Sequence, residues 1–314
     1  MKSLFVMDPL ERLHVQGDST YVLMRECCDR GFPVHYCTPD ELFAEHGLAG
    51  ARCRPVQVDA APPFFEEGEE QVRSLGDFDV VWMRKDPPFD LHYIFSCYVL
   101  EMTPPGTLVV NDPGGLVRLN EKLWAMSFAD LHPPTLLSRD PAQIRAFVGR
   151  FDRAVLKPWD GNGGRGVVVT HGADRNLNAL IELLTDEGRR SLVAQQYIEA
   201  IARGDKRILL YDGEPVGAVM RIPGAEDHRG NMHVGARVER TELTERDRAI
   251  CDRLRPHLKV AGMLFVGIDV IGDYLTEINV TSPTGIREIN RLEGCKLEAD
   301  LVDLVAARVA GSGA

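Results

Sequence analysis

The stretch from Val266 to Asn279 constrains this chain most, because it places acidic residues within otherwise apolar strands. Apolar residues alternate around Asp269, Gly272 begins a turn, and a second strand carries Glu277 and Asn279. Residues two apart leave the same face of a strand, and a β-hairpin brings Asp269 across from Glu277. We therefore expect these residues to present two carboxylates and one amide oxygen together. Such oxygen donors suit Mg²⁺, with Mn²⁺ as the alternative ion.

The alternative is a surface hairpin whose polar face meets water. The flanking residues favour the metal site, because Asn279 runs into Val280, Thr281, Ser282 and Pro283, with no charged loop following. A carboxylate on a buried strand is costly unless a partner compensates its charge. A bound metal ion is one such partner.

Composition limits the class of protein. The chain has 314 residues, enough for two or three lobes, and a formal net charge of −11, which argues against a nucleic-acid partner. Its seven cysteines lack the spacing of a disulfide framework, so we expect reduced thiols. No signal-like N-terminus and no membrane-spanning apolar run is found in the sequence. We expect a cytoplasmic protein that has no membrane partner.

The N-terminal part begins as strand, helix and strand over residues 3–7, 19–30 and 34–37, a pattern that predicts a parallel sheet covered by helices. Residues 52–76 are acidic and rich in proline, and we expect an exposed, partly irregular excursion there. We divide the chain into an N-terminal α/β substrate-side domain (1–120), a central lobe with a glycine flap (121–200) and a C-terminal lobe with a lid and the hairpin (201–314).

A charged loop follows the strand at residues 79–83. It runs from Arg84 to Asp90 and contains a basic pair and two consecutive prolines. Open α/β sheets place ligand groups in loops at the carboxyl ends of parallel strands. The loop is therefore suited to an anionic substrate, and the alternative is a solvated turn.

A glycine-rich segment lies at residues 160–166, between strands at 153–157 and 167–170. Such a flap can wrap phosphate oxygens with its backbone N–H groups. It is neither a P-loop nor a dinucleotide fingerprint, because the glycines lead into a strand and not into a helix. A purely structural turn is the alternative, but Lys157 just before the flap is placed to reach phosphate.

Beyond it, residues 222–240 are rich in Gly, His and Arg and show almost no periodicity, as expected for a lid or a disordered segment.

The order of these features resembles the ATP-grasp ligases, and within them the bacterial glutathione synthetases, over essentially the whole chain. The motifs that carry the resemblance are M-R-K-D-P-P-F-D, N-E-K-L, L-K-P-W-D-G-N-G-G-R-G, G-D-K-R and L-T-E-I-N-V-T-S-P-T. The resemblance implies an ATP-grasp fold with an N-terminal parallel α/β domain.

It also implies roles for individual residues. The resemblance implies that the ATP phosphates are bound by Lys122, Lys157, Gly163, Gly164, Arg165 and Gly166, the adenine by Gln196, Tyr197 and Ile198, and the ribose by Asp205. It implies catalytic roles for Arg207 and Arg221, which face the transferring phosphoryl group, and for Arg229, which secures glycine. It implies that the peptide substrate is bound by Arg84, Asp86, Ser282, Pro283 and Thr284, and the metal ion by Asp269, Glu277 and Asn279.

The implied reaction joins γ-L-glutamyl-L-cysteine to glycine. ATP phosphorylates the dipeptide carboxylate, and the glycine amine displaces phosphate to give glutathione, ADP and phosphate. The family also suggests a homo-oligomer, most simply a tetramer. Two alternatives stay open: an ATP-grasp ligase with other substrates, and a non-catalytic nucleotide-binding protein.

Overall fold

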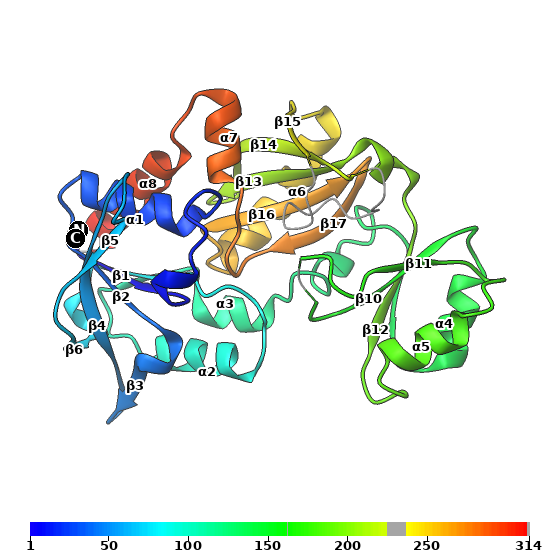
Figure 1. Ribbon diagram of the computed structural model, residues 1–314, viewed down its shortest axis with the longest axis horizontal. Helices are drawn as coiled ribbons and strands as arrows, with labels where there is room; N and C mark the ends of the chain where they lie inside the picture. Colours follow the sequence, from blue (N-terminus) through cyan, green and yellow to red (C-terminus); the bar gives the residue numbers. More distant parts are fainter. Residues whose placement is uncertain (162, 225–236, 313–314) are drawn as a thin grey trace.

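The computed structural model describes residues 1–161, 163–224 and 237–312. These residues form a mixed α/β structure with three sheets (Figure 1). An N-terminal sheet lies at one end, a small sheet with two helices at the other, and a five-stranded sheet between them. The hairpin expected from the sequence belongs to this central sheet.

The N-terminal sheet has a parallel centre, as the strand–helix–strand pattern predicts. Helix α1 (Ser19–Asp29) connects its first two parallel strands and is capped by Asp18, whose carboxylate accepts from the Thr20 and Tyr21 N–H groups. Helix α2 (Leu91–Leu100) and helix α3 (Pro113–Arg118) follow later. The parallel strands are β1 (Ser3–Val6), β2 (Val34–Cys37), β7 (Val80–Met83) and β8 (Leu108–Val110).

The expectation of an exposed, partly irregular excursion at residues 52–76 is only partly right: residues 59–63 are exposed and belong to no strand, but strands occupy much of the rest. The antiparallel strands β3 (Leu42–Glu45), β4 (Leu48–Val58), β5 (Phe65–Glu67) and β6 (Gln71–Ser74) extend the sheet there. Small apolar side chains explain the difference: Ala51, Cys53, Val56 and Val58 are buried along β4. Their burial outweighs the acidic residues and prolines that follow.

The small sheet is antiparallel and has the order β11-β10-β12-β9. Helices α4 (Pro141–Val148) and α5 (Leu177–Leu184) pack on one face, where Leu156 and Ala194 are buried. Alternation places Lys157 and Gln195 on the other face. The strands are β9 (Thr135–Ser138), β10 (Ala154–Pro158), β11 (Val168–Thr170) and β12 (Leu192–Gln196).

The central sheet has the order β15-β14-β13-β16-β17. Helix α6 (Glu245–Val260) covers the face that carries Ile208, Ile268 and Val270. By alternation, the intervening Arg207 and Asp269 belong to the opposite face. The strands are β13 (Asp205–Tyr211), β14 (Glu214–Ile222), β15 (Arg237–Arg240), β16 (Phe265–Ile271) and β17 (Tyr274–Asn279).

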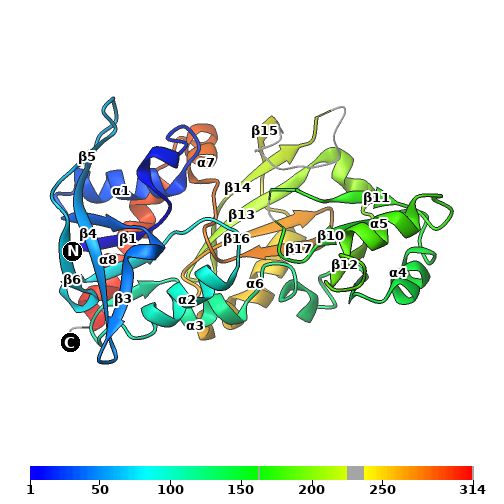
Figure 2. The ribbon, with the colours of Figure 1, turned by 60° about the horizontal axis from the view of Figure 1, so that its bottom comes forward.

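The chain ends with helices α7 (Ile286–Glu293) and α8 (Leu297–Ser312), and α8 returns to the N-terminal sheet, beside α1 (Figure 2). The Arg30 guanidinium on this side donates to the Ala299 carbonyl at 3.1 Å. The three-part division of the chain stays a prediction.

All seven cysteines lie in the described residues and are free thiols, as expected. No helix in the described ranges is long and apolar enough to cross a membrane.

Candidate active site

The β16–β17 hairpin confirms the predicted pairing, because Asp269 lies opposite Glu277 in the sheet register. The turn contains Gly272, whose φ of 59° is the left-handed conformation that glycine adopts easily. Leu275 and Ile278 anchor the second strand in the core. Local alternation and one glycine are therefore sufficient to bring the two carboxylates together.

Asp269 is buried and bound by two guanidinium groups. Arg207 donates from Nε to Oδ1 at 2.5 Å and from Nη2 to Oδ2 at 3.0 Å, while Arg221 Nη2 lies 3.1 Å from Oδ1. Asn279 Nδ2 also donates to Oδ2, at 3.2 Å. Burial alone would raise the pKa of Asp269, but Arg207 and Arg221 outweigh it and hold that pKa well below its usual range.

Sheet register produces this network. Arg207 on β13 lies opposite Asp269 on β16, and Asp205 on β13 lies opposite Arg221 on β14. Both Asp205 oxygens accept from Arg221, with Nη2 2.5 Å from Oδ1 and 2.6 Å from Oδ2. The assignment of Asp205 to ribose stays a prediction.

Glu277 faces two lysines that come from different segments. Its Oε1 lies 3.6 Å from Lys122 Nζ and 3.7 Å from Lys157 Nζ. Burial lowers the pKa of Lys157, and Glu277 offsets only part of this shift. Burial would also lower the pKa of Lys122, but Glu277 and Glu121 raise it above its usual value. The two predicted phosphate-binding lysines therefore meet at one carboxylate.

The glycine flap contacts one lysine of this pair. Lys122 Nζ donates to the Gly161 carbonyl at 2.6 Å. Gly163, Gly164 and Gly166 have φ values of 60°, 74° and 71°, which L-residues with side chains rarely adopt. Arg165 between them is exposed. Glycine adopts these φ values without strain, so the flap can turn sharply at these positions.

Arg84 is buried without a carboxylate partner. Its Nε donates to Thr20 Oγ1 and its Nη2 to the Pro283 carbonyl, each at 3.1 Å, and its guanidinium lies 5.0 Å from the Phe265 ring centroid. Among the described residues no carboxylate lies within ion-pair distance of Arg84; burial lowers its pKa, and the carboxylates of Asp18 and Asp86 offset only part of that shift. A buried cation of this kind is suited to an anionic ligand.

The 281–284 loop connects Arg84 with Arg207. Ser282 Oγ donates to the Arg84 carbonyl at 3.4 Å, and Arg207 Nη1 donates to the Thr284 carbonyl at 3.1 Å. Asp86 lies in the same charged loop, and its N–H donates to Asp8 Oδ2 at 3.0 Å. The predicted substrate residues are thus one connected group.

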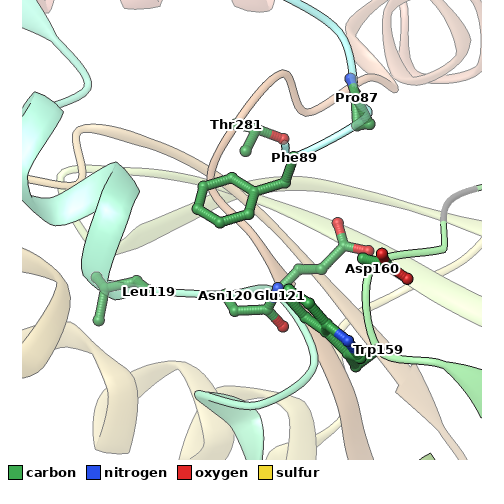
Figure 3. A pocket seen from close by; sticks show the side chains of 8 residues that line it. All are labelled: Pro87, Phe89, Leu119, Asn120, Glu121, Trp159, Asp160 and Thr281. Carbon is green, nitrogen blue, oxygen red and sulfur yellow. The ribbon is translucent and has the colours of Figure 1, made fainter. Parts of the chain in front are cut away.

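A small cavity of about 20 Å³ lies between the charged loop and the flap (Figure 3). Phe89 and Thr281 line one side, and Trp159 and Glu121 the other. Sequence reasoning missed Phe89, Trp159 and Glu121, although each lies inside a motif that we recognised. A larger cavity of about 400 Å³ lies near Asp212, at the far end of β13.

The predicted adenine residues lie at the end of β12. Gln196, Tyr197 and Ile198 are half-buried, and the Arg153 guanidinium lies 4.0 Å from the Tyr197 ring centroid. Arg229 and most of the 222–240 lid lie outside the described residues. Within the described ranges no group of three or more His, Cys, Asp or Glu side chains is arranged to hold a metal. The predicted metal site, with two carboxylates and one amide, stays a prediction.

Solved structures with the same fold define the class. D-cycloserine synthetase DcsG superposes with a TM-score of 0.68 at 15% identity, over 98% of this chain and 99% of that one. The ATP-grasp ligase PsnB, complexed with a precursor variant, Mg and ADP, gives a TM-score of 0.65 at 19% identity, over 98% and 99%. At such identities the likeness concerns the fold. The chain therefore has the fold of the ATP-grasp ligases.

Family models narrow the assignment. The N-terminal domain model of prokaryotic glutathione synthetase matches residues 1–117, and the ATP-grasp domain model of the same family matches residues 121–294. The chain belongs to the prokaryotic glutathione synthetase family.

Full-length relatives agree with this family. Glutathione synthetase of Mesorhizobium japonicum is 44% identical over 98% of this chain and 99% of the relative. That of Brucella melitensis is 45% identical over the same shares, and that of Gloeobacter violaceus is 46% identical over 96% of each.

Proposed function

We propose that this chain joins γ-L-glutamyl-L-cysteine to glycine, using ATP, and releases glutathione, ADP and phosphate in the cytoplasm. The observation that carries the proposal is the arrangement of cations. Lys122 and Lys157 meet at Glu277, Arg207 and Arg221 meet at Asp269, and Arg84 is left without a carboxylate. Two clusters suit a polyphosphate and its transferring group, and the third suits a substrate anion.

The first step brings an anion to a polyanion. The dipeptide carboxylate attacks the γ-phosphorus of ATP, the bond from that phosphorus to the β–γ bridging oxygen breaks, and ADP leaves. Catalysis then depends on positioning and on neutralising charge in the transition state. Lys122 and Lys157 hold the phosphates, Arg207 and Arg221 face the transferred group, and Arg84 holds the dipeptide.

The second step forms the peptide bond. The glycine amine attacks the acyl phosphate carbon, loses a proton, and phosphate leaves. Water must be excluded, since it would hydrolyse the acyl phosphate. The flap over Lys122 closes one side of this space.

The donor set fits a divalent ion bound together with nucleotide phosphates. Oε1 is the Glu277 oxygen nearest to the two lysines, and Asn279 uses its Nδ2 toward Asp269, which leaves the Asn279 Oδ1 to serve as a metal ligand. Asp269 would hold the ion only by sharing oxygens that now face Arg207 and Arg221. A bound Mg²⁺ would neutralise phosphate charge, and Mn²⁺ is the alternative.

Acceptor selection is assigned to Arg229 on the strength of the family resemblance. Glycine has no side chain, so its carboxylate is the group that a guanidinium can grip with two hydrogen bonds. Arg229→Ala should raise the Michaelis constant for glycine about ten- to hundredfold and leave that for ATP nearly unchanged. Arg237→Ala tests the second candidate for this clamp, which is exposed and pairs with Glu239 at 2.6 Å. A glycine Michaelis constant within about twofold of the parent in Arg229→Ala would leave Arg229 as a solvated loop residue and make Arg237 the next candidate.

We also infer a homo-oligomer, a tetramer by family resemblance, with α2 supplying one contact between copies. Leu91, Phe95 and Tyr98 of α2, and Met102 just after its end, recur at helical spacing and are 67%, 59%, 46% and 42% exposed. The pattern is symmetric about its midpoint, so an antiparallel second copy would set Leu91 against Met102 and Phe95 against Tyr98. Sedimentation should show smaller particles for Phe95→Glu; an unchanged particle size would exclude this contact.

The reaction is tested by measuring ADP and phosphate release from the purified protein with ATP and Mg²⁺. The panel should pair γ-glutamylcysteine, other dipeptides and free amino acids as acceptors of phosphate with glycine, alanine and serine as amines. We expect turnover with γ-glutamylcysteine and glycine and formation of glutathione. Faster turnover with another pair would favour an ATP-grasp ligase with other substrates.

A further inference from the structure

Lys157 is hydrogen-bonded to a buried polar network that no sequence motif indicated. Its Nζ donates to Gln195 Oε1 at 3.4 Å, on the neighbouring strand β12. Gln195 Nε2 lies 3.1 Å from His132 Nε2 and 2.9 Å from Thr135 Oγ1. Lys157, Gln195 and His132 are 7%, 5% and 7% exposed, so water cannot replace these contacts freely.

Two constraints fix which way the Gln195 amide points. His132 Nδ1 lies 2.8 Å from the Leu275 carbonyl, which can only accept, so Nδ1 carries the proton. A neutral ring then leaves Nε2 as an acceptor. Thr135 Oγ1 donates to the Pro133 carbonyl at 2.8 Å and is likewise left to accept. Both acceptors require the Gln195 NH₂ group, which turns its Oε1 toward the Lys157 ammonium.

The neutral ring is consistent with its surroundings. Burial lowers the pKa of His132 to about 4, the nearby Lys157 acts in the same direction, and the Leu275 carbonyl and Glu277 oppose it. A protonated ring would donate from both nitrogens. Gln195 would then present its oxygen to His132 and its NH₂ group to the lysine, where two donors would face each other.

The network also joins two sheets. Gln195 and Lys157 belong to the small sheet, whereas Leu275 lies on β17 of the central sheet, two residues before Glu277. The Leu275 N–H donates to the Leu131 carbonyl at 3.0 Å. Residues 131–132 therefore hydrogen-bond both the N–H and the carbonyl of Leu275. His132 thereby fixes the small sheet relative to the strand that carries Glu277.

We propose that His132 and Gln195 are positioning residues for Lys157: the Nδ1–H tautomer of His132 orients the Gln195 amide, whose oxygen sets the position of the phosphate-binding ammonium. The inference rests on the proposed role of Lys157 in nucleotide binding. It adds no catalytic group, since neither His132 nor Gln195 contacts a reacting atom.

A double-mutant cycle on ATP binding tests this coupling without requiring turnover. The dissociation constant of ATP with Mg²⁺ is measured by calorimetry for the parent, Gln195→Met, Lys157→Met and the double variant, without other substrates. Gln195→Met should weaken ATP binding about tenfold in the parent and by less than about twofold in the Lys157→Met background. Gln143→Met, on the exposed face of α4, is the matched control and should bind ATP as the parent does.

Equal losses in both backgrounds, or none in either, would overturn the inference while leaving the proposed reaction intact. If Lys157→Met itself left ATP binding unchanged, the assignment of Lys157 would fall and the inference with it. Nitrogen-15 spectra of the parent protein give a second measurement that needs no variant to fold. At neutral pH we expect His132 with protonated Nδ1 and bare Nε2; protonated Nε2 would contradict the proposed orientation.

Discussion

The central sheet and the charged loop after β7 both contain buried arginines, but these arginines differ in whether a carboxylate compensates their charge. On β13 and β14, Arg207 and Arg221 meet Asp269 and Asp205 within the protein. In the loop, Arg84 meets a hydroxyl, a carbonyl and an aromatic ring. Arg207 and Arg221 have carboxylate partners within the protein, whereas no carboxylate of the described residues lies within ion-pair distance of Arg84. We propose that the substrate anion pairs with Arg84, and that Arg207 and Arg221 stabilise the fold as well as facing the transferred phosphoryl group.

Removing a compensated cation should have the largest effect. Arg221→Met leaves Asp205 and part of Asp269 buried without their partner, which costs about 3–5 kcal/mol of unfolding free energy. Urea unfolding followed by circular dichroism measures this loss. A variant as stable as the parent would show that water or Arg207 compensates both carboxylates.

Glu277 is intermediate between the compensated arginines and Arg84, because it faces two lysines but its side chain remains 24% exposed. Glu277→Gln should lower kcat roughly a hundred- to thousandfold, since it removes one charge of the proposed metal site. The fold should be retained, because the amide keeps the shape of the side chain. Glu182→Gln, on an exposed position of α5, is the control for steady-state assays. Near-parent turnover of the Glu277 variant at saturating Mg²⁺ would exclude the metal assignment.

Arg84 gives the sharpest contrast with Arg221. Arg84→Met should raise the Michaelis constant for the dipeptide about ten- to hundredfold and that for ATP by less than about twofold. Its unfolding free energy should not fall, because a buried cation without a carboxylate is lost. A destabilisation as large as that of Arg221→Met would make Arg84 a structural residue and remove the contrast.

The smallest expected effect concerns pH. The folded pKa of His132 is about 4, below its ordinary value of 6.5, so the unfolded chain binds the extra proton first as pH falls. Unfolding free energy should therefore decrease from pH 6.5 to pH 4, with His132 contributing on the order of 2 kcal/mol. Burial also lowers the pKa of His35 to about 4, so His35 contributes to the same slope. His132→Phe should flatten the slope while His35 keeps its share; an unchanged slope would mean that His132 is charged in the folded protein.

Sequence reasoning succeeded where the determinants are local. The hairpin follows from alternating residues around Asp269 and a glycine turn, and the start of the N-terminal sheet follows from a capped helix between two apolar strands. The flap follows from glycines that need positive φ. In each case a segment of fewer than about thirty residues carries the whole signal.

Long-range contacts could not be predicted in this way. Arg84 donates to Pro283, 199 residues later, and Arg207 to Asp269, 62 residues later. Sequence spacing does not indicate that the Asp269 oxygens pair with guanidinium groups. The network behind Lys157 was missed for the same reason, since His132, Gln195 and Leu275 meet only when two sheets pack together. Strand β4 was missed because its buried side chains are small.

Transfer of oxygen from substrate to phosphate tests the proposed reaction most directly. γ-Glutamylcysteine labelled with oxygen-18 in its cysteinyl carboxylate is incubated with the enzyme, ATP, Mg²⁺ and glycine, and the released phosphate is analysed by mass spectrometry. Attack of the carboxylate on the γ-phosphate followed by displacement with glycine predicts one labelled oxygen in each phosphate released. Unlabelled phosphate accompanied by glutathione, or release of AMP and pyrophosphate, would contradict the acyl phosphate route.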